Sequence, residues 1–376
     1  MSTRTAEWPT EDSLDELAQL AWTAGAEIVG TLIQRLSKPT PSHYLGKGKL
    51  GELASLRREI AYDVVIFDDE LSPTQQRNIE EALQVKVIDR TALILDIFGR
   101  RASTREGRLQ VELAQHQYLL PRLAGQWSHL ERLGGGIGTR GPGETQLETD
   151  RRLIRQRISH LKKEIEQVRR HRALYRHRRR RQGIPVVALV GYTNAGKSTL
   201  LNALSHADVL VEDKLFATLD PTTRHLILPN SVRVLMTDTV GFIQKLPATI
   251  IAAFRATLEE LAEADLLLHV IDITHKNAVE QSRTVEKILG ELKLDNKLRI
   301  TALNKVDLVK DKELAGTVAK LVSIDDQPYV LISAARSWGL NRLLEAIAEA
   351  LGNKGETAVG RPPDAIVEAA ASNQRS

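Results

Sequence analysis

The chain has 376 residues, of which 42% are hydrophobic and 27% are charged, and it contains no cysteine. This composition is typical of a globular protein of about two or three domains, and it excludes a disordered chain and a disulfide-bonded scaffold. The polar start lacks the apolar core of a signal peptide, and no apolar stretch is long enough to cross a bilayer, so we expect a cytoplasmic protein without a membrane segment. The net charge is only +4, so a surface for a polyanion would have to come from a local basic cluster.

The N-terminal part of the chain predicts a small sheet covered by helices. Helical patterns alternate there with short apolar runs, as in an α/β domain. Ser72 followed by proline is a good helix start. The expected elements are a helix over 13–24, a strand over 27–33, a helix over 47–60, a strand over 63–67, a helix over 72–83 and a strand over 85–88. We find no catalytic constellation among them.

A helical hairpin is expected after residue 103. Leu109 and Leu113 are spaced for one helical face, and Pro121 should end or kink that helix. The glycine-rich segment 134–146 should hold no regular structure, and it is either a hinge or a loop that approaches a phosphate. A second apolar seam then predicts a helix antiparallel to the first. The seam consists of Leu147, Ile154, Ile158, Leu161, Ile165 and Val168.

Arginine and lysine are concentrated on this second helix. The basic residues are Arg151, Arg152, Arg155, Arg157, Lys162 and Lys163, followed by Arg169, Arg170, Arg172, Arg176, Arg178, Arg179, Arg180 and Arg181. They form either a solvated face or a surface for the phosphates of a nucleic acid. Only 4% of the residues are aromatic, which argues against recognition by base stacking and favours a structured RNA.

An octapeptide after the hairpin has two glycines separated by four residues and followed by Lys and Ser, which is the phosphate-loop pattern. An apolar run over 186–190 precedes it and a helical pattern over 199–204 follows it, as the motif requires. Glycine lets the backbone approach phosphate oxygens, the helix N-terminus attracts an anion, Lys197 adds a positive charge and Ser198 can ligate magnesium. The predicted loop consists of Gly191, Tyr192, Thr193, Asn194, Ala195, Gly196, Lys197 and Ser198.

Further apolar runs predict a doubly wound, mostly parallel α/β sheet around this loop. Strands are expected over 232–236, 265–271, 298–303 and 329–332. Ligands of such sheets bind beyond the carboxyl ends of the strands, where the remaining motifs lie. The first of these motifs is Asp238, Thr239, Val240 and Gly241. Its carboxylate suits the surroundings of a magnesium ion, and the N–H of its glycine can contact a γ-phosphate.

A second motif at a strand end selects the base. It consists of Asn304, Lys305, Val306 and Asp307. Asp307 can accept hydrogen bonds from N1–H and the exocyclic amino group of guanine, which adenine does not offer in that arrangement. This preference conflicts with an ATP-driven RNA remodeller. The segment Ser333, Ala334 and Ala335 follows the next strand, and a backbone N–H there can contact guanine O6.

At this point the sequence resembles the HflX family of ribosome-associated GTPases, which are related to translation factors. The resemblance covers about residues 25–351 and rests on segments 44–49, 89–98, 141–152 and 216–224 beside the nucleotide motifs. It implies a P-loop GTPase that binds the large ribosomal subunit and ribosomal RNA, and that dissociates or rescues ribosomes under stress. We accordingly place an N-terminal tail and helix at 1–24, a small α/β domain at 25–102, the helical hairpin at 103–182, the GTPase domain at 183–351 and a weakly ordered tail at 352–376.

The same resemblance implies that Ser198 and Thr218 ligate magnesium, with Thr218 in a switch that orders around the γ-phosphate. The hydroxyls of Thr222 and Thr223 are alternatives that chemistry alone leaves open. Asn194 is either a ligand of an activating potassium ion or a simple turn residue. The switch segment that we include in the nucleotide site is Phe216, Ala217, Thr218, Leu219 and Asp220.

Phe242 follows Gly241 at the position where many GTPases carry a glutamine that orients water. A phenyl ring cannot orient water, so hydrolysis should depend on Lys197, Thr218 and the backbone of Gly241, and it should be slow until the ribosome stimulates it. A different hypothesis is a GTP-dependent regulatory switch that acts on a protein partner, with the arginines merely solvated. We expect a monomer.

Overall fold

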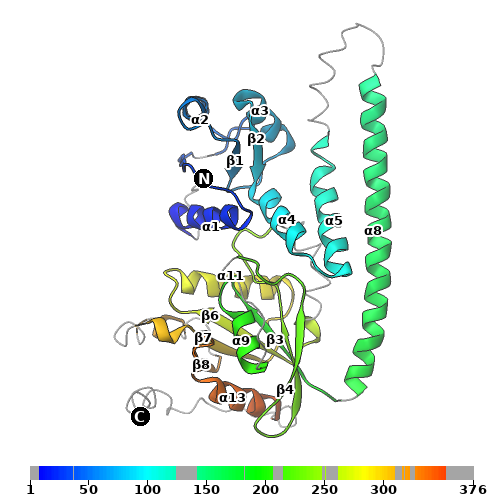
Figure 1. Cartoon of the computed structure of the whole chain (residues 1–376), viewed down its shortest axis with the longest axis vertical. Helices are drawn as coiled ribbons and strands as arrows, with labels where there is room; N and C mark the ends of the chain where they lie inside the picture. Colours follow the sequence, from blue (N-terminus) through cyan, green and yellow to red (C-terminus); the bar gives the residue numbers. More distant parts are fainter. Residues whose placement is uncertain are drawn as a thin grey trace.

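The chain forms a six-stranded sheet at one end, a small two-stranded sheet at the other, and a long helical hairpin beside both (Figure 1). The computed structural model describes residues 8–36, 38–123, 142–181, 183–205, 215–247, 250, 261–309, 316, 318–321 and 327–352, but not the side chains of 142–147 and 173–181. Among these residues, no helix combines the length and the apolar character needed to cross a membrane.

The N-terminal part follows the predicted α/β pattern in most of its elements. These elements are α1 (Thr10–Thr23), α2 (Lys47–Ile60), β1 (Val64–Phe67), α3 (Pro73–Leu83), β2 (Lys86–Asp89) and α4 (Arg90–Arg101). β1 and β2 pair in parallel, and α2 and α3 share one apolar core with them. Ser72 and Gln75 form a capping box at the start of α3, because each side chain accepts a hydrogen bond from the other residue's N–H. The helix α4 was not predicted.

The predicted strand over 27–33 is wrong. The segment belongs to no strand, and among the described residues it pairs with no neighbour. Ile28, Val29 and Ile33 remain 47%, 51% and 37% exposed. An apolar, β-branched run favours extended backbone, but a strand also requires a partner, which local sequence does not supply.

The hairpin consists of α5 (Arg105–Leu119) and α8 (Pro142–Arg181), which lie side by side (Figure 1). They run antiparallel, because Glu106 pairs with Arg172 while Glu112 pairs with Arg157. α5 ends before Pro121, as predicted. Its core joins the two predicted seams through Leu109, Leu113, Ile158, Leu161, Ile165 and Val168.

The start of α8 corrects one prediction about the glycine-rich segment. Residues 142–146 are helical, and Pro142 opens the helix, where the missing N–H of proline costs nothing. The rest of that segment, the side chains of Leu147 and of the arginines beyond Arg172, and the tail after 352 lie outside the description.

The large sheet has the predicted doubly wound, mostly parallel arrangement. Its strands are β3 (Val186–Gly191), β4 (Thr222–Ile227), β5 (Arg233–Asp238), β6 (Leu266–Asp272), β7 (Arg299–Asn304) and β8 (Tyr329–Leu331), in the order β4-β5-β3-β6-β7-β8. Only β4, which was not predicted, is antiparallel to its neighbour. The helices beside the sheet include α9 (Lys197–Ser205), α11 (Ala278–Glu291) and α13 (Leu340–Gly352).

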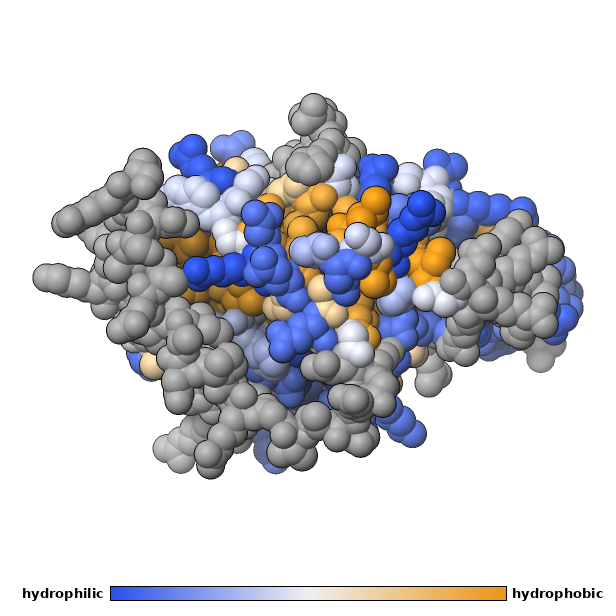
Figure 2. Space-filling model, turned by 90° about the horizontal axis from the view of Figure 1, so that it is seen from below, coloured by the Kyte–Doolittle hydropathy of each residue, from blue (hydrophilic) through white to orange (hydrophobic). Residues whose placement is uncertain are grey.

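The two faces of this sheet have different partners. Val187 and Leu189 of β3 pack with α9 and α13, whereas Ala188 and Val190 pack with α11 and with α1 and α4 of the N-terminal part. One continuous apolar core therefore joins the N-terminal helices to the large sheet. At the opposite end, apolar side chains lie at the surface among polar ones (Figure 2), and Ile227 and Val232 at the turn after β4 are exposed.

Candidate active site

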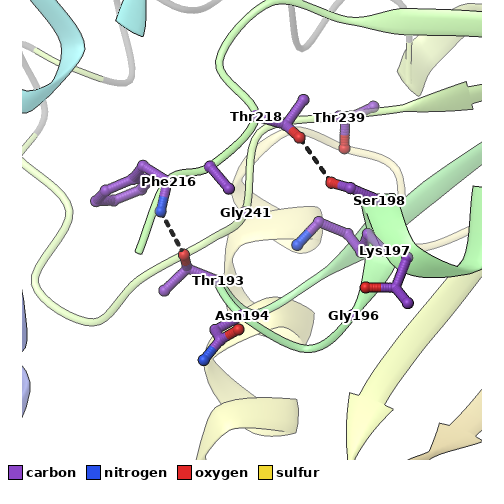
Figure 3. A pocket seen from close by; sticks show the side chains of 11 residues that line it. Thr193, Asn194, Gly196, Lys197, Ser198, Phe216, Thr218, Thr239 and Gly241 are labelled. Carbon is purple, nitrogen blue, oxygen red and sulfur yellow. Dashed lines mark hydrogen bonds between the residues drawn. The ribbon is translucent and has the colours of Figure 1, made fainter. Parts of the chain in front are cut away.

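A pocket lies at the carboxyl end of β3, where the phosphate loop leads into α9 (Figure 3). β3 is bordered by β5 on one side and β6 on the other, so the pocket lies at the switch point of the sheet. Its walls come from the phosphate loop, the switch segment and the segment after β5. The lining residues are Thr193, Asn194, Gly196, Lys197, Ser198, Thr199, Phe216, Ala217, Thr218, Thr239 and Gly241.

Two glycines allow backbone segments to approach closely around this pocket. A Cβ atom on Gly241 would lie 2.6 Å from the Cα atom of Thr193 and 3.0 Å from the Nζ atom of Lys197. Gly196 has a φ of +93°, and a Cβ atom there would lie 2.3 Å from the Nδ2 atom of Asn304. Glycine is therefore required at both positions.

Lys197 points into the pocket and is buried (Figure 3). Its Nζ donates hydrogen bonds to the carbonyl oxygens of Gly191, at 3.2 Å, and Tyr192, at 2.8 Å. Burial lowers the pKa of Lys197 to about 8, while the nearby Asp238 carboxylate acts in the opposite direction. A phosphate group would supply the negative charge that this buried ammonium group lacks.

The side-chain oxygen atoms of three residues, Ser198, Thr218 and Asp238, meet beside Lys197. The hydroxyl oxygens of Ser198 and Thr218 are 2.6 Å apart, and they donate to Oδ2 of Asp238 at 2.6 Å and 2.9 Å. Burial raises the pKa of Asp238, although Lys197 and the two hydroxyl groups oppose this. The other carboxylate oxygen, Oδ1, is buried and has no hydrogen-bond partner among the described residues. Two hydroxyl groups and a carboxylate with one unsatisfied buried oxygen fit the preferences of a magnesium ion and its water ligands.

The alternative threonines lie elsewhere. Thr222 and Thr223 belong to β4 and are exposed, and the hydroxyl of Thr223 contacts Thr237 at 3.0 Å. Thr218 is thus the switch-segment threonine beside Ser198.

Phe242 joins the phosphate loop through its backbone. Its N–H donates to the carbonyl oxygen of Gly191 at 3.0 Å, and its carbonyl oxygen accepts from the N–H of Thr193 at 2.7 Å. Its ring is buried in the core that the sheet shares with the N-terminal helices, and it does not line the pocket. Phe242 therefore fixes the backbone of this segment and offers no group to a water molecule.

Asn304 connects the base-selecting motifs to the phosphate loop. Its Nδ2 donates to the carbonyl oxygen of Ala195 at 2.9 Å, and its Oδ1 accepts from the N–H of Ala334 at 3.0 Å. Lys305 has a left-handed backbone, with a φ of 67°, and its Nζ pairs with Asp272 at 2.6 Å. Asp307 follows in a single 3-10 turn, Val306–Leu308, and is half-buried.

The last predicted segment closes the same edge of the sheet. Ser333 is fully buried, and its hydroxyl oxygen accepts from the N–H of Arg336 at 3.1 Å. Ala335 is exposed beside it. The phosphate loop and both base motifs thus form one continuous edge, and the bridging role of Asn304 was not predicted.

Comparison with known proteins agrees with this geometry. Residues 11–99 and 101–179 match the family models described as "GTP-binding GTPase N-terminal" and "GTP-binding GTPase Middle Region", and residues 186–305 match "50S ribosome-binding GTPase". GTPase HflX of Caldanaerobacter subterraneus is 54% identical over 341 residues, which are 91% of this chain and 77% of that protein. GTPase HflX of Escherichia coli is 43% identical over 343 residues, which are 90% of this chain and 79% of that protein.

The chain belongs to the HflX family of GTPases. A solved relative, described as the complex of SsGBP with GDP, has a TM-score of 0.51 and 25% sequence identity, and the match covers 90% of this chain and 95% of that one. The predicted P-loop GTPase fold and the prediction of a GTP hydrolase are therefore confirmed.

Several residues of the predicted nucleotide site in this HflX-family GTPase face the N-terminal part. The hydroxyl group of Tyr192 is hydrogen-bonded to Glu16 of α1, and burial raises the pKa values of both groups. Leu219 and Val240 are buried in the core shared with α1 and α4. These orientations had no signal in the local sequence, because the partners lie far away along the chain.

The two ends of the switch segment also contact the N-terminal part of the chain. The Phe216 ring, at 1% exposure, packs edge to face on Phe98 of α4, although its N–H donates to Thr193 Oγ1 at 2.8 Å. The Asp220 carboxylate faces the start of α5. Burial alone would raise the pKa of Asp220, but hydrogen bonds from residues 103–104 outweigh burial and lower it.

Proposed function

We propose that this GTPase binds the large ribosomal subunit by contacts of α8 with ribosomal RNA, and that GTP hydrolysis gates its release. In this account it dissociates or rescues ribosomes under stress. The match of residues 186–305 to a model described as "50S ribosome-binding GTPase" supports the partner. The basic outer face of α8 is the observation that carries the proposal.

This outer face lies away from α5. The apolar seam of α8 packs on α5, and several basic side chains elsewhere on the described part of α8, residues 148–172, are exposed. The exposed residues without an acidic partner among the described contacts are Arg152, Arg155, Lys162 and Lys163. They suit the phosphates of a structured RNA, since positive charge at regular spacing gives sequence-independent affinity.

The nucleotide chemistry follows from the pocket. Lys197 and the phosphate-loop backbone hold the phosphates, Ser198 and Thr218 hold magnesium with Asp238 nearby, and Gly241 contacts the γ-phosphate. When bound, magnesium neutralises the charge that develops on the transferred phosphoryl group. Asp307 accepts from guanine, and the exposed loop at Ala335 offers a backbone donor to O6.

A potassium ion remains a prediction. Asn194 lines the pocket with a φ of 62°, a left-handed conformation that asparagine tolerates, so the turn role alone accounts for its identity. Equal hydrolysis rates in potassium and sodium buffers would rule the ion out.

Cosedimentation with purified large subunits tests the proposal. The protein loaded with a non-hydrolysable GTP analogue should pellet with the subunits at physiological salt, and the GDP-loaded protein should pellet less. Replacing Arg152, Arg155, Lys162 and Lys163 by glutamine should weaken binding and make it less dependent on salt.

A matched control neutralises four exposed basic residues outside the hairpin: Lys38, Lys86, Arg233 and Lys287. This variant should bind like the wild type. If the α8 variant binds as well as the control, α8 is not the RNA surface. If the wild type does not pellet in either nucleotide state, the proposal of ribosome binding fails and the hypothesis of a switch for a protein partner is favoured.

A further inference from the structure

We infer that Asp220 is a positioning residue for GTP hydrolysis. It ties the switch segment to the first turn of α5, so that the corner between α4 and α5 holds Thr218 at the metal site. This inference rests on the proposed role of Thr218 as a magnesium ligand. It also makes the helical hairpin sensitive to the nucleotide, because α5 is one half of that hairpin.

The Asp220 carboxylate accepts four hydrogen bonds from two adjacent residues. Its Oδ2 accepts from the N–H of Ser103 at 2.8 Å, the hydroxyl of Ser103 at 2.7 Å and the N–H of Thr104 at 2.8 Å. Its Oδ1 accepts from the hydroxyl of Thr104. Thr104 is the N-cap of α5, and its hydroxyl oxygen also accepts from the N–H of Gly107. The carboxylate thus extends the cap of α5, where the helix dipole favours a negative charge.

Gly107 makes room for this contact. A Cβ atom on Gly107 would lie 2.3 Å from Oδ1 of Asp220 and 3.2 Å from the hydroxyl oxygen of Thr104. Glycine is a poor helix former, so its presence in the first turn of α5 needs a local reason. The close approach of Asp220 gives a physical reason for glycine at this position.

Phe216, on the other side of Thr218 in the chain, packs on α4 close to the same corner. The ring centroid of Phe216 lies 4.7 Å from that of Phe98, at an interplanar angle of 81°. Phe216 has a φ of 56°, which is uncommon for a residue other than glycine. Since Phe216 and Asp220 are each two residues from Thr218, both contacts limit how far its hydroxyl can move from Ser198.

The corner itself is anchored to the phosphate loop. Arg90, the first residue of α4, is buried and pairs with Glu16 and Asp68. Glu16 in turn holds the Tyr192 hydroxyl group. α4 therefore starts from a fixed point beside the phosphate loop and ends at the corner that holds the switch. Loss of Thr218 from the metal site after hydrolysis would loosen Asp220, and with it the cap of α5.

Three variants test this inference in the full-length chain. Asp220→Ala removes the carboxylate, and Gly107→Ala displaces it while favouring the helical state of α5. Asp96→Ala is the matched control, because Asp96 is an exposed carboxylate of α4 that pairs only with Arg100 among the described contacts. Two readouts serve: the magnesium concentration that half-saturates binding of a fluorescent non-hydrolysable GTP analogue, and hydrogen exchange of residues 103–112.

Asp220→Ala and Gly107→Ala should each raise the half-saturating magnesium concentration about tenfold, the effect of losing a charge-assisted contact, and leave GDP affinity within about twofold. The control should behave like the wild type. In the wild type, hydrogen exchange at 103–112 should be slower with the analogue than with GDP. In each of the two variants, the exchange rate should be the same with the analogue as with GDP.

The outcomes separate the two levels of the account. If Thr218→Ala does not raise the magnesium requirement, the assignment of Thr218 fails. If Thr218→Ala raises the magnesium requirement but Asp220→Ala does not, the positioning role of Asp220 is refuted while the assignment of the metal site stands. If only Asp220→Ala acts and Gly107→Ala does not, Asp220 works directly on the nucleotide and the contact with α5 is not the cause.

Discussion

The hydroxyl group of Tyr192, in the phosphate loop, is hydrogen-bonded to the carboxylate of Glu16, in α1. The same hydroxyl oxygen accepts from the N–H of Gln244 at 2.8 Å. Lys245, the next residue, pairs with Asp68 and Asp69 at the end of β1. The phosphate loop is therefore hydrogen-bonded to the N-terminal part, and the segment after Gly241 is joined to it by ion pairs.

Tyr192→Phe should destabilise the protein by about 1–3 kcal/mol, because it leaves buried Glu16 and the N–H of Gln244 without this partner. Urea unfolding of the nucleotide-free protein measures the change. Tyr62→Phe is the control, since the Tyr62 hydroxyl donates to the Leu53 carbonyl oxygen at a half-buried site, and a loss below about 1 kcal/mol is expected there. A loss for Tyr192→Phe no larger than that of the control would contradict a special contribution of the Tyr192 contact.

Asp307→Asn should reverse the preference for guanine. The variant presents an N–H donor to the amino group of guanine, whereas xanthine carries an oxygen at that position. We expect GTP affinity to fall at least about a hundredfold and affinity for xanthosine triphosphate to rise. Equilibrium competition against a fluorescent GDP measures both. Retention of GTP binding by the variant would contradict the role of Asp307.

Nucleotide affinity should depend on the protonation of Lys197, whose pKa burial lowers to about 8. Above that pH the free protein loses the proton, while a bound phosphate favours the charged form, so binding must take up a proton. Affinity should therefore fall about fivefold between pH 8 and 9. A Lys197→Met variant should bind weakly with no such dependence. A flat wild-type profile up to pH 9 would contradict the lowered pKa of Lys197.

Stability should fall in acid because of His269, in β6. Burial, with Arg299 and Lys197 nearby, lowers the pKa of His269 to about 3 from its ordinary value of 6.5. As the pH falls, His269 takes up a proton in the unfolded chain before it does so in the folded protein. The contribution of neutral His269 to the free energy of unfolding is therefore complete above pH 6.5 and declines by about 1.4 kcal/mol per pH unit as the pH falls towards 3. Glu286, which lies near His269, is engaged by Arg299 at 2.6 Å.

Urea unfolding between pH 5 and 8 tests this dependence. His269→Gln should reduce the acid slope of the free energy of unfolding, and His225→Gln, at an exposed position of β4, should leave it unchanged. The same slope in all three proteins would remove His269 from the explanation.

Local sequence predicted the elements whose signals are local. The phosphate loop, its flanking strand and helix, and the parallel strands have apolar runs and motifs that need no knowledge of the fold. The strand over 27–33 failed because pairing depends on a partner. β4 was missed because, at the edge of the sheet, Leu226 is its only buried residue, so its sequence shows no apolar run. The contact between Asp220 and Thr104 joins residues 116 positions apart, and the one sequence feature connected with it is the glycine at position 107.

Single-turnover GTP hydrolysis, measured with and without purified large ribosomal subunits, tests the central claim most directly. Because Phe242 is buried and offers no group to water, the account predicts slow hydrolysis by the protein alone and a rate at least about tenfold higher with large subunits. Fast hydrolysis without subunits, or a rate that the subunits leave unchanged, would contradict it.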